Sequence, residues 1–188
     1  MLLAKQGVDV NQAMNNGCTP LFIASQKGHS EVVSMLLAKQ GVDVNQATND
    51  GCTPLFIASQ NGHSEVVSML LAKQGIDVNQ AGDDGVTPLI IASEKGHAEV
   101  VSMLLAKQGV NVNQAMNNGC TPLYVASEKG HSEVVSLLLA KQGVNVNQAM
   151  NNGCTPLYVA SEKGHSEVVS LLLAKQGVNV NQAMNNGC

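Results

Sequence analysis

The sequence contains no arginine and no tryptophan, and aromatic residues make up only 2% of it. Phosphate contacts in nucleic-acid complexes need a basic surface, whereas this chain has 10 lysines against 14 acidic residues and a formal charge of −4. We therefore expect no nucleic-acid partner. Charged residues reach only 13% and apolar residues 44%, which excludes both a disordered tail and a highly charged coiled coil.

Long apolar runs are also missing, since no stretch approaches the roughly 20 residues that a helix needs to cross a bilayer. The first residues, Met1–Gln6, lack the charged start and long apolar middle of a secretory signal. No Cys-x-x-Cys pair of the kind that binds zinc is present. These absences favour a cytoplasmic protein without membrane contact, metal or cofactor.

A repeat of 34 residues organises the whole chain. The dipeptide Thr-Pro recurs at this spacing, at Thr19, Thr53, Thr87, Thr121 and Thr155. A partial repeat at residues 1–18 is followed without a linker by full repeats at 19–52, 53–86, 87–120, 121–154 and 155–188, and the last two are identical. Because a fixed period of this length is typical of repeat arrays, we expect residues 1–188 to form a single array.

Each repeat predicts two short helices and a loop. In the fourth repeat, Thr121 suits the N-cap of a first helix, and Gly130 supplies the left-handed residue that ends it. Ser132 is the expected cap of a second, more apolar helix that ends at Gly143. The Asn-Asn-Gly sequence that follows indicates a tight turn. One repeat cannot bury both helices alone, so we expect neighbours to stack and share a core.

Three motifs of the repeat resemble the ankyrin repeat, namely Thr-Pro-Leu-Tyr-Val-Ala-Ser, Gly-His-Ser-Glu-Val-Val-Ser-Leu-Leu-Leu and Gly-Val-Asn-Val-Asn. The resemblance covers essentially the whole chain. It implies an all-α fold, in which helix-turn-helix units stack into a solenoid and β-hairpin loops project from it. It also implies a scaffold for protein partners, which would bind the concave face made by the loop tips and the first helices.

The repeat departs from the family's usual pattern in length, at the position after Thr-Pro-Leu and at the residue that opens the loop, where the family often has Asp and this chain has Met14, Thr48, Gly82, Met116 and Met150. It has 34 residues where the family usually has 33. The family's His after Thr-Pro-Leu is replaced, so its hydrogen bond to the loop is lost and we expect a packed side chain there, at Phe22, Phe56, Ile90, Tyr124 and Tyr158. The family implies a structural role in holding neighbouring loops together for Asn11, Asn45, Asn79, Asn113, Asn147 and Asn181.

Cysteine and histidine recur along the array at equivalent positions. Equivalent residues of stacked helices lie about 8–10 Å apart, which exceeds the Cα separation of about 7 Å that a disulfide tolerates. We therefore expect thiols at Cys18, Cys52, Cys120, Cys154 and Cys188. The same spacing prevents joint metal binding, so we expect each histidine to tie the connection between the helices of its own repeat, at His29, His63, His97, His131 and His165.

A hydrolase triad is the alternative interpretation of Ser127, His131 and Glu133. However, an active site needs one deep pocket with a unique set of residues, and here the same set recurs along a shallow stack. We therefore expect a protein that is not an enzyme.

The resemblance places the partner-binding residues at the loop tips and at the exposed end of each first helix. This surface is polar and nearly neutral, and it lacks the aromatic and arginine anchors that dominate many interfaces. The expected contact residues are Asn15, Asn16, Gln26, Lys27, Asn49, Asp50, Gln60, Asn61, Asp83, Asp84, Glu94, Lys95, Asn117, Asn118, Glu128, Lys129, Asn151, Asn152, Glu162 and Lys163.

Two other interpretations stay open: a self-associating structural array, and a duplicated or engineered array without a selected ligand. Repeat arrays normally end in repeats with polar outer faces, yet the last repeat copies its neighbour, and Met1–Gln6 is typical of the tail of a second helix. Either the array continues further or another copy covers its ends. The residues that we expect to face outward in the last repeat are Val159, Ala160, Val168, Leu171 and Leu172.

Overall fold

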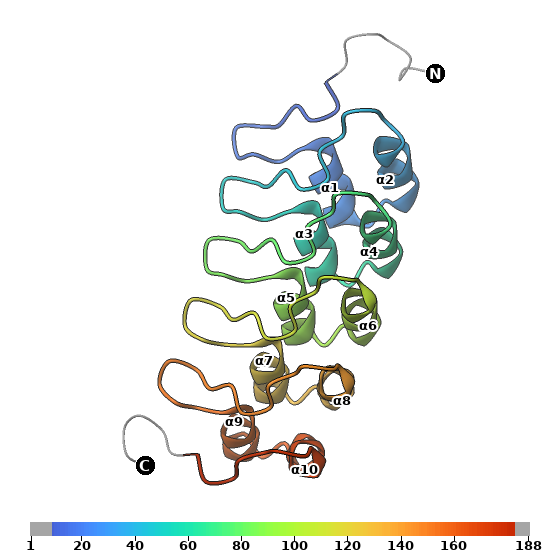
Figure 1. Ribbon diagram of the computed structural model, residues 1–188. Coiled ribbons are helices and arrows are strands. Elements are labelled where there is room, and N and C mark those ends of the chain that lie inside the picture. Colours follow the sequence, from blue (N-terminus) through green and yellow to red (C-terminus); the bar gives the residue numbers. More distant parts are fainter. Residues whose placement is uncertain (1–8, 183–188) are drawn as a thin grey trace.

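Helix pairs follow one another along a curved stack in the computed structural model, which describes residues 9–182 (Figure 1). Odd-numbered helices form an inner row beside the loops, and even-numbered helices form an outer row (Figure 1). The ten helices of the described residues are α1 (Pro20–Lys27), α2 (Ser30–Leu37), α3 (Pro54–Gln60), α4 (Ser64–Leu71), α5 (Pro88–Lys95), α6 (Ala98–Ala106), α7 (Pro122–Lys129), α8 (Ser132–Ala140), α9 (Pro156–Glu162) and α10 (Ser166–Ala174).

The inner helices begin as the sequence predicts. Each follows a threonine whose hydroxyl accepts a hydrogen bond from the backbone N–H three residues on, at 3.1 Å for Tyr124 and Thr121. A proline occupies the first helical position, where no N–H is needed. Gly130 ends α7 in the left-handed conformation, with φ 75°. The predictions for Thr121 and Gly130 are therefore confirmed.

The outer helices differ from the prediction at both ends. Ser132 is the first residue of α8 and not its cap, because His131 occupies the N-cap position without a side-chain hydrogen bond. The His131 N–H donates to the Ala126 carbonyl at 3.0 Å, a bond that closes the end of α7, and α8 begins directly after His131. The helix also ends at Ala140, before Gly143, which lies in the following turn with φ 85°.

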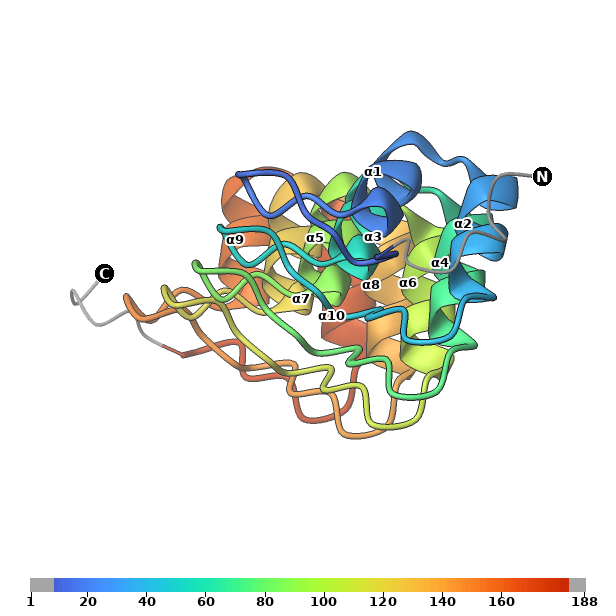
Figure 2. The same ribbon diagram turned by 90° about the horizontal axis from the view of Figure 1, so that it is seen from above.

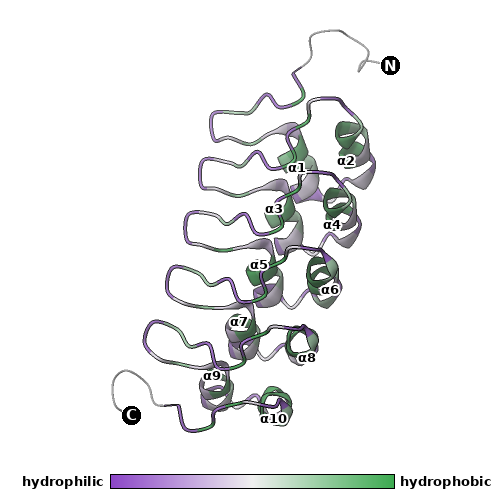
Figure 3. Ribbon diagram, viewed as in Figure 1, coloured by the Kyte–Doolittle hydropathy of each residue, from purple (hydrophilic) through white to green (hydrophobic). Residues whose placement is uncertain are grey.

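The core runs unbroken along the stack between the two rows of helices. Leucines of the outer row, such as Leu70, Leu104 and Leu138, are fully buried, and so is the alanine of each central inner helix, such as Ala92. Apolar residues gather where the rows face each other, while the loops are mainly polar (Figure 3). The inner helices pack more closely on one another than the outer helices do, so the stack curves with the inner row on its concave side.

The loops project together from one side of the helices (Figure 2). Each is closed by two backbone bonds, from Met116 N to Cys120 O and from Gly119 N to Met116 O, both 2.9 Å in the fourth loop. Only the bond from Met116 to Cys120 joins the two sides of the loop at its base, and residues 9–182 contain no strand. The expected β-hairpins are therefore tight turns without a β-ladder.

Asparagine and aromatic positions behave as expected within the stack. Asn113 donates from its amide to the Gly143 carbonyl at 2.7 Å and accepts from the Asn145 N–H at 2.8 Å, so it joins successive repeats. Tyr124 packs in a second apolar cluster at the loop base, together with Ile90 and two cysteines. The exception is Tyr158, which is exposed.

The prediction for the outward-facing residues of the last repeat is wrong. Val159, Ala160, Val168 and Leu172 are buried and Leu171 is half-buried, because these side chains face the repeat before them. The apolar side chains that the last repeat exposes are instead Tyr158, Leu173 and Val180. The predictions for Met1–Gln6 and Cys188 fall outside the described residues.

Candidate protein-binding surface

The twenty residues expected to contact a partner lie in two rows that follow the stack, and we call them together the loop-side surface. The ten loop-tip residues are all exposed. The ends of the inner helices are exposed or half-buried, with Gln26, Gln60, Glu94 and Glu128 in the half-buried group. The predicted positions are thus accessible to a partner.

Backbone hydrogen bonds join each loop tip to the next. The first tip residue donates its N–H to the carbonyl of the second residue in the preceding tip, at 3.1 Å for Asn117 and Asp84 and 3.0 Å for Asn151 and Asn118. The same bond recurs at 3.1 Å for Asn49 and at 3.4 Å for Asp83. The tips therefore form one continuous ribbon.

Asparagine side chains at the tips make hydrogen bonds to backbone groups of their own or the neighbouring loop. The amide of Asn117 donates to the Asp83 carbonyl at 3.1 Å, and that of Asn151 donates to the Asn117 carbonyl at 3.0 Å. The side-chain oxygen of Asn118 accepts from the Cys120 N–H at 3.0 Å. Sequence analysis assigned these residues to binding and missed this structural role, although their recurrence in successive repeats was a signal for it.

Negative charge at the tips is confined to the second and third of the five loop tips. Asp50, Asp83 and Asp84 stand where the other tips carry asparagine. A hydrogen bond from the Thr48 hydroxyl is the main cause that lowers the pKa of Asp50. Beside it, burial and then the Asp50 charge raise the pKa of Cys52 to about 11. The middle of the tip row is thus anionic and its thiol is protonated.

The second row, at the ends of the inner helices, is close to neutral. Adjacent residues form ion pairs at 3.2 Å for Glu94 and Lys95 and at 3.6 Å for Glu128 and Lys129. Exposed pairs of this kind contribute little to stability. Burial is the main cause that raises the pKa values of Cys120 and Tyr124 at the loop base, and the Glu128 charge adds to the effect.

The histidines join neighbouring repeats, which corrects the prediction that each ties the helices of its own repeat. His131 Nε2 lies 2.9 Å from the Glu94 carbonyl oxygen, at the C-terminal end of α5, where carbonyls lack partners within the helix. Equivalent pairs at 2.9–3.1 Å involve His63, His97 and His165. Gly96 leaves room for the ring, because a Cβ there would come within 2.8 Å of it.

Lysines make a second bond between repeats that sequence analysis missed. Lys107 Nζ donates to the Leu71 carbonyl at 2.6 Å, at the end of α4, and Lys141 Nζ donates to the Leu105 carbonyl at 2.6 Å. The cation also interacts favourably with the negative end of the helix dipole. A lysine at the same place in every repeat was the available signal.

The residues weighed as a hydrolase triad are not brought together. The Ser127 hydroxyl is fully buried without a hydrogen bond, and the His131 ring is engaged by the Glu94 carbonyl. None of Cys18, Cys52, Cys120 and Cys154 forms a disulfide.

Metal-binding and membrane-spanning features were also sought in the described part of the chain. Residues 9–182 hold no group of three histidine, cysteine or acidic side chains that could bind a metal ion. Over the same residues, no helix has the length and apolar character that a bilayer requires.

Comparison with known proteins gives one family. The family model for ankyrin repeats, three copies in length, matches residues 1–82, 41–116, 79–150 and 112–184. These matches overlap and together cover residues 1–184. A search of curated proteins found no match.

Proposed function

Because the chain belongs to the ankyrin-repeat family, whose members typically bind other proteins, we propose that it is a non-catalytic scaffold with a protein partner on its loop-side surface. The observation that carries the proposal is the ribbon of loop tips. Its backbone bonds between successive loops hold accessible polar groups in fixed positions. A surface ordered before binding loses less conformational entropy when a partner arrives.

The partner's chemistry follows from the charge at the tips. Asp83 and Asp84 are exposed, and Asp50 lies on the neighbouring tip, where its backbone carbonyl accepts from the Asp83 N–H. Desolvated charge pairs within an interface favour partners of opposite charge. A lysine or arginine of the partner is therefore the group expected at the third loop. The proposal includes a reducing, cytoplasmic setting, in which the thiols of Cys18 and Cys52 would persist.

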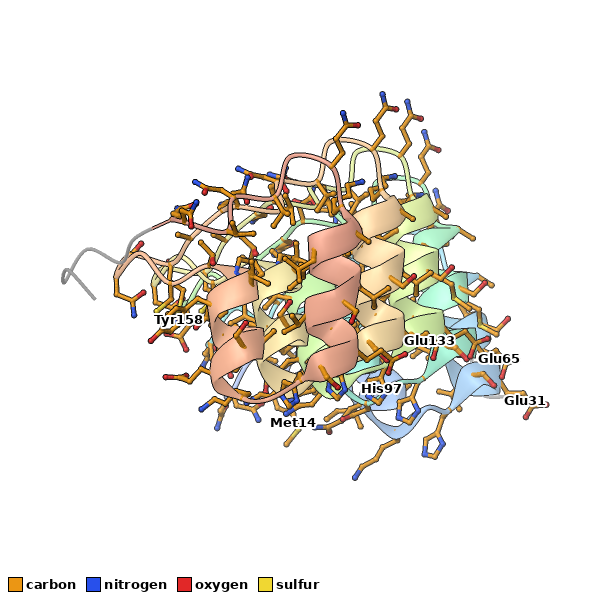
Figure 4. All side chains as sticks on the ribbon, turned by 90° about the horizontal axis from the view of Figure 1, so that it is seen from below. Met14, Glu31, Glu65, His97, Glu133 and Tyr158 are labelled. Atoms are coloured by element: carbon orange, nitrogen blue, oxygen red, sulfur yellow. The ribbon has the colours of Figure 1, made fainter. Side chains whose placement is uncertain are left out.

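The test replaces Asp83 and Asp84 together by asparagine, in the full chain used as bait in a cell extract. These replacements give the third tip the residues that the fourth and fifth already carry, so the fold should be kept. The matched control replaces Glu65 and Glu133 by glutamine, which removes the same charge from the outer row (Figure 4).

The proposal expects a captured protein that the tip variant loses and the outer-row variant retains, with at least a tenfold difference in apparent affinity, or about 1.4 kcal/mol. Quantitative mass spectrometry of the captured proteins measures this difference. Capture that is equal for both variants would contradict a partner at the tips.

A further inference from the structure

Asparagine stands directly before glycine at four places in the described part of the chain. Three of them are loop tips, at Asn16, Asn118 and Asn152, and the fourth is Asn61, which caps the end of α3. All four asparagines are exposed. Glycine has no Cβ to hinder its backbone nitrogen, so this nitrogen can attack the side-chain amide of the asparagine before it. Asn186 also precedes glycine but falls outside the described residues.

The three tip asparagines hold their side chains in the same way. In each tip, the side-chain oxygen accepts a hydrogen bond from the N–H of the cysteine two residues on, at 3.1 Å for Asn16 and at 3.0 Å for Asn118 and Asn152. This bond folds the side chain over the backbone of the intervening glycine, which favours attack by the glycine nitrogen. It also places a backbone donor on the oxygen where negative charge develops during that attack.

Two backbone bonds restrain the tip. The Gly119 N–H donates to the Met116 carbonyl at 2.9 Å, and the Asn118 carbonyl accepts from the Asn151 N–H at 3.0 Å. The first of these bonds must open, because the attacking nitrogen has to lose its proton. The loops project from the side of the helices, so this opening leaves the core intact (Figure 2). Exposed loop bonds of this kind open at a small cost in free energy.

Asn61 has the same neighbour in sequence but a different setting. Its amide nitrogen donates to the Gln26 carbonyl of the preceding repeat at 2.9 Å, so the side chain points away from its own glycine. Gly62 lies so close to the His97 ring that a Cβ would come within 2.8 Å of it. Rotation of the backbone between Asn61 and Gly62 would therefore disturb the contact between repeats, and we expect this asparagine to react slowly.

The fold already accepts an aspartate at the reactive tip position. Asp50 and Asp84 occupy it in the second and third tips. In both tips the following glycine keeps the turn bond, at 2.9 Å from Gly51 to Thr48 and at 2.9 Å from Gly85 to Gly82. The replacement of a tip asparagine by aspartate is thus compatible with the turn.

We propose that Asn16, Asn118 and Asn152 are sites of spontaneous deamidation, which turns the neutral loop tips into anionic ones. The glycine nitrogen forms a bond to the asparagine Cγ and closes a succinimide ring. The bond from Cγ to the side-chain nitrogen breaks, and ammonia leaves with the proton of the glycine N–H. Water then adds a hydroxyl to one ring carbonyl and returns a proton to the ring nitrogen, which gives aspartate or isoaspartate. This chemistry goes beyond the proposed function and needs no partner.

Each event changes both the charge and the order of the tip row. One negative charge is added per site, so all five described tips carry an acid after complete reaction. The aspartate product keeps the length of the main chain. The isoaspartate product adds a methylene to it at residue 118, whose carbonyl accepts from the Asn151 N–H, and so loosens the bond between the fourth and fifth tips.

The test incubates the purified full chain in water labelled with oxygen-18 at mildly alkaline pH and follows its tryptic peptides by mass spectrometry. Asn16 and the two later tips should each gain one labelled oxygen. Asn118 and Asn152 are measured together, because the peptides 108–129 and 142–163 have the same sequence. Asn61, the matched control within the same molecule, should react at least about tenfold more slowly than the tips.

Urea separates the effect of the structure from that of the sequence. In the unfolded chain the hydrogen bond of Asn61 to Gln26 is lost, so its rate should rise to that of the tips. Unlabelled tips in the folded chain, equal rates at Asn61 and the tips in the folded chain, or an Asn61 rate that urea leaves unchanged would overturn the proposal.

A double variant assigns the reaction within the shared peptide. Asn118→Gln together with Asn152→Gln keeps both amides but requires a six-membered ring, which closes much more slowly. The label should disappear from this peptide and stay at Asn16. Label that persists in the peptide would place the reaction at another of its asparagines, such as Asn117, and would contradict the assignment to the residue before glycine.

Discussion

Single residues at fixed positions connect each repeat to its neighbours. An asparagine, a histidine and a lysine each bond to the backbone of an adjacent repeat, as Asn113, His131 and Lys141 do between the third and fourth repeats. The partner of each of these side chains is a main-chain atom, so substitution of the side chain of the partner residue leaves the hydrogen bond in place. This explains how the repeats can differ at the loop tips while they stack in the same way.

The Cys52 thiol provides a test at the residue scale. Because its pKa is raised to about 11, only about 0.1% of it is thiolate at pH 8, and it should react slowly with iodoacetamide although it is half-buried. Asp50→Asn removes one of the causes of the shift and should speed alkylation at pH 8 several-fold. Mass spectrometry of the Cys52 peptide measures the rate.

Glu133→Gln is the control for the Cys52 experiment, since it removes a charge from the outer row and should leave the rate unchanged. In the wild type, the rate should climb with pH up to about pH 11, the pKa of the thiol, and level off only above it. A Cys52 rate that does not respond to Asp50→Asn would show that the carboxylate has no influence on the thiol.

Helices of seven to nine residues are too short to be stable alone in water, so their ends matter. The inner helices carry their own threonine cap, which the sequence predicts because the hydroxyl acts within one turn. The outer helices lack such a cap, and the prediction for Ser132 failed because a turn formed by Gly130 and His131 sets the start of α8. The Leu71 carbonyl at the end of α4 accepts a hydrogen bond from Lys107 of the next repeat, a contact that no local pattern shows.

Replacement of Lys107 by methionine tests this interaction at the scale of the element. The apolar stem is kept while the charged bond to the Leu71 carbonyl is lost, so the free energy of unfolding should fall by about 1 kcal/mol. Urea denaturation of the full chain measures the change.

The matched control is Lys95→Met, which removes only an exposed ion pair with Glu94 and should change stability by less than about 0.5 kcal/mol. Equal effects of the two replacements would contradict a stabilising role for the lysine at the end of α4.

At the scale of the whole molecule, the period and the motifs were enough to predict a stack of helix pairs and the accessible positions on its loop side. They did not separate the two faces of a repeat, because Val168 and Leu173 are both apolar and both buried when neighbours lie on each side. Only the ends of the stack distinguish them, where Val168 stays buried and Leu173 becomes exposed. The histidine bonds between repeats were hidden for the same reason, since donor and acceptor lie 37 residues apart.

The account's central claim is that each repeat is stabilised by the neighbours on its two faces. Hydrogen exchange of the intact chain, followed by mass spectrometry at low protein concentration, tests it most directly. Amides of α5 and α6 should be the most protected, and protection should fall toward α1 and α2 at one end and α9 and α10 at the other, because the end repeats have one neighbour. Equal protection of all five helix pairs, or greatest protection at an end, would contradict the claim.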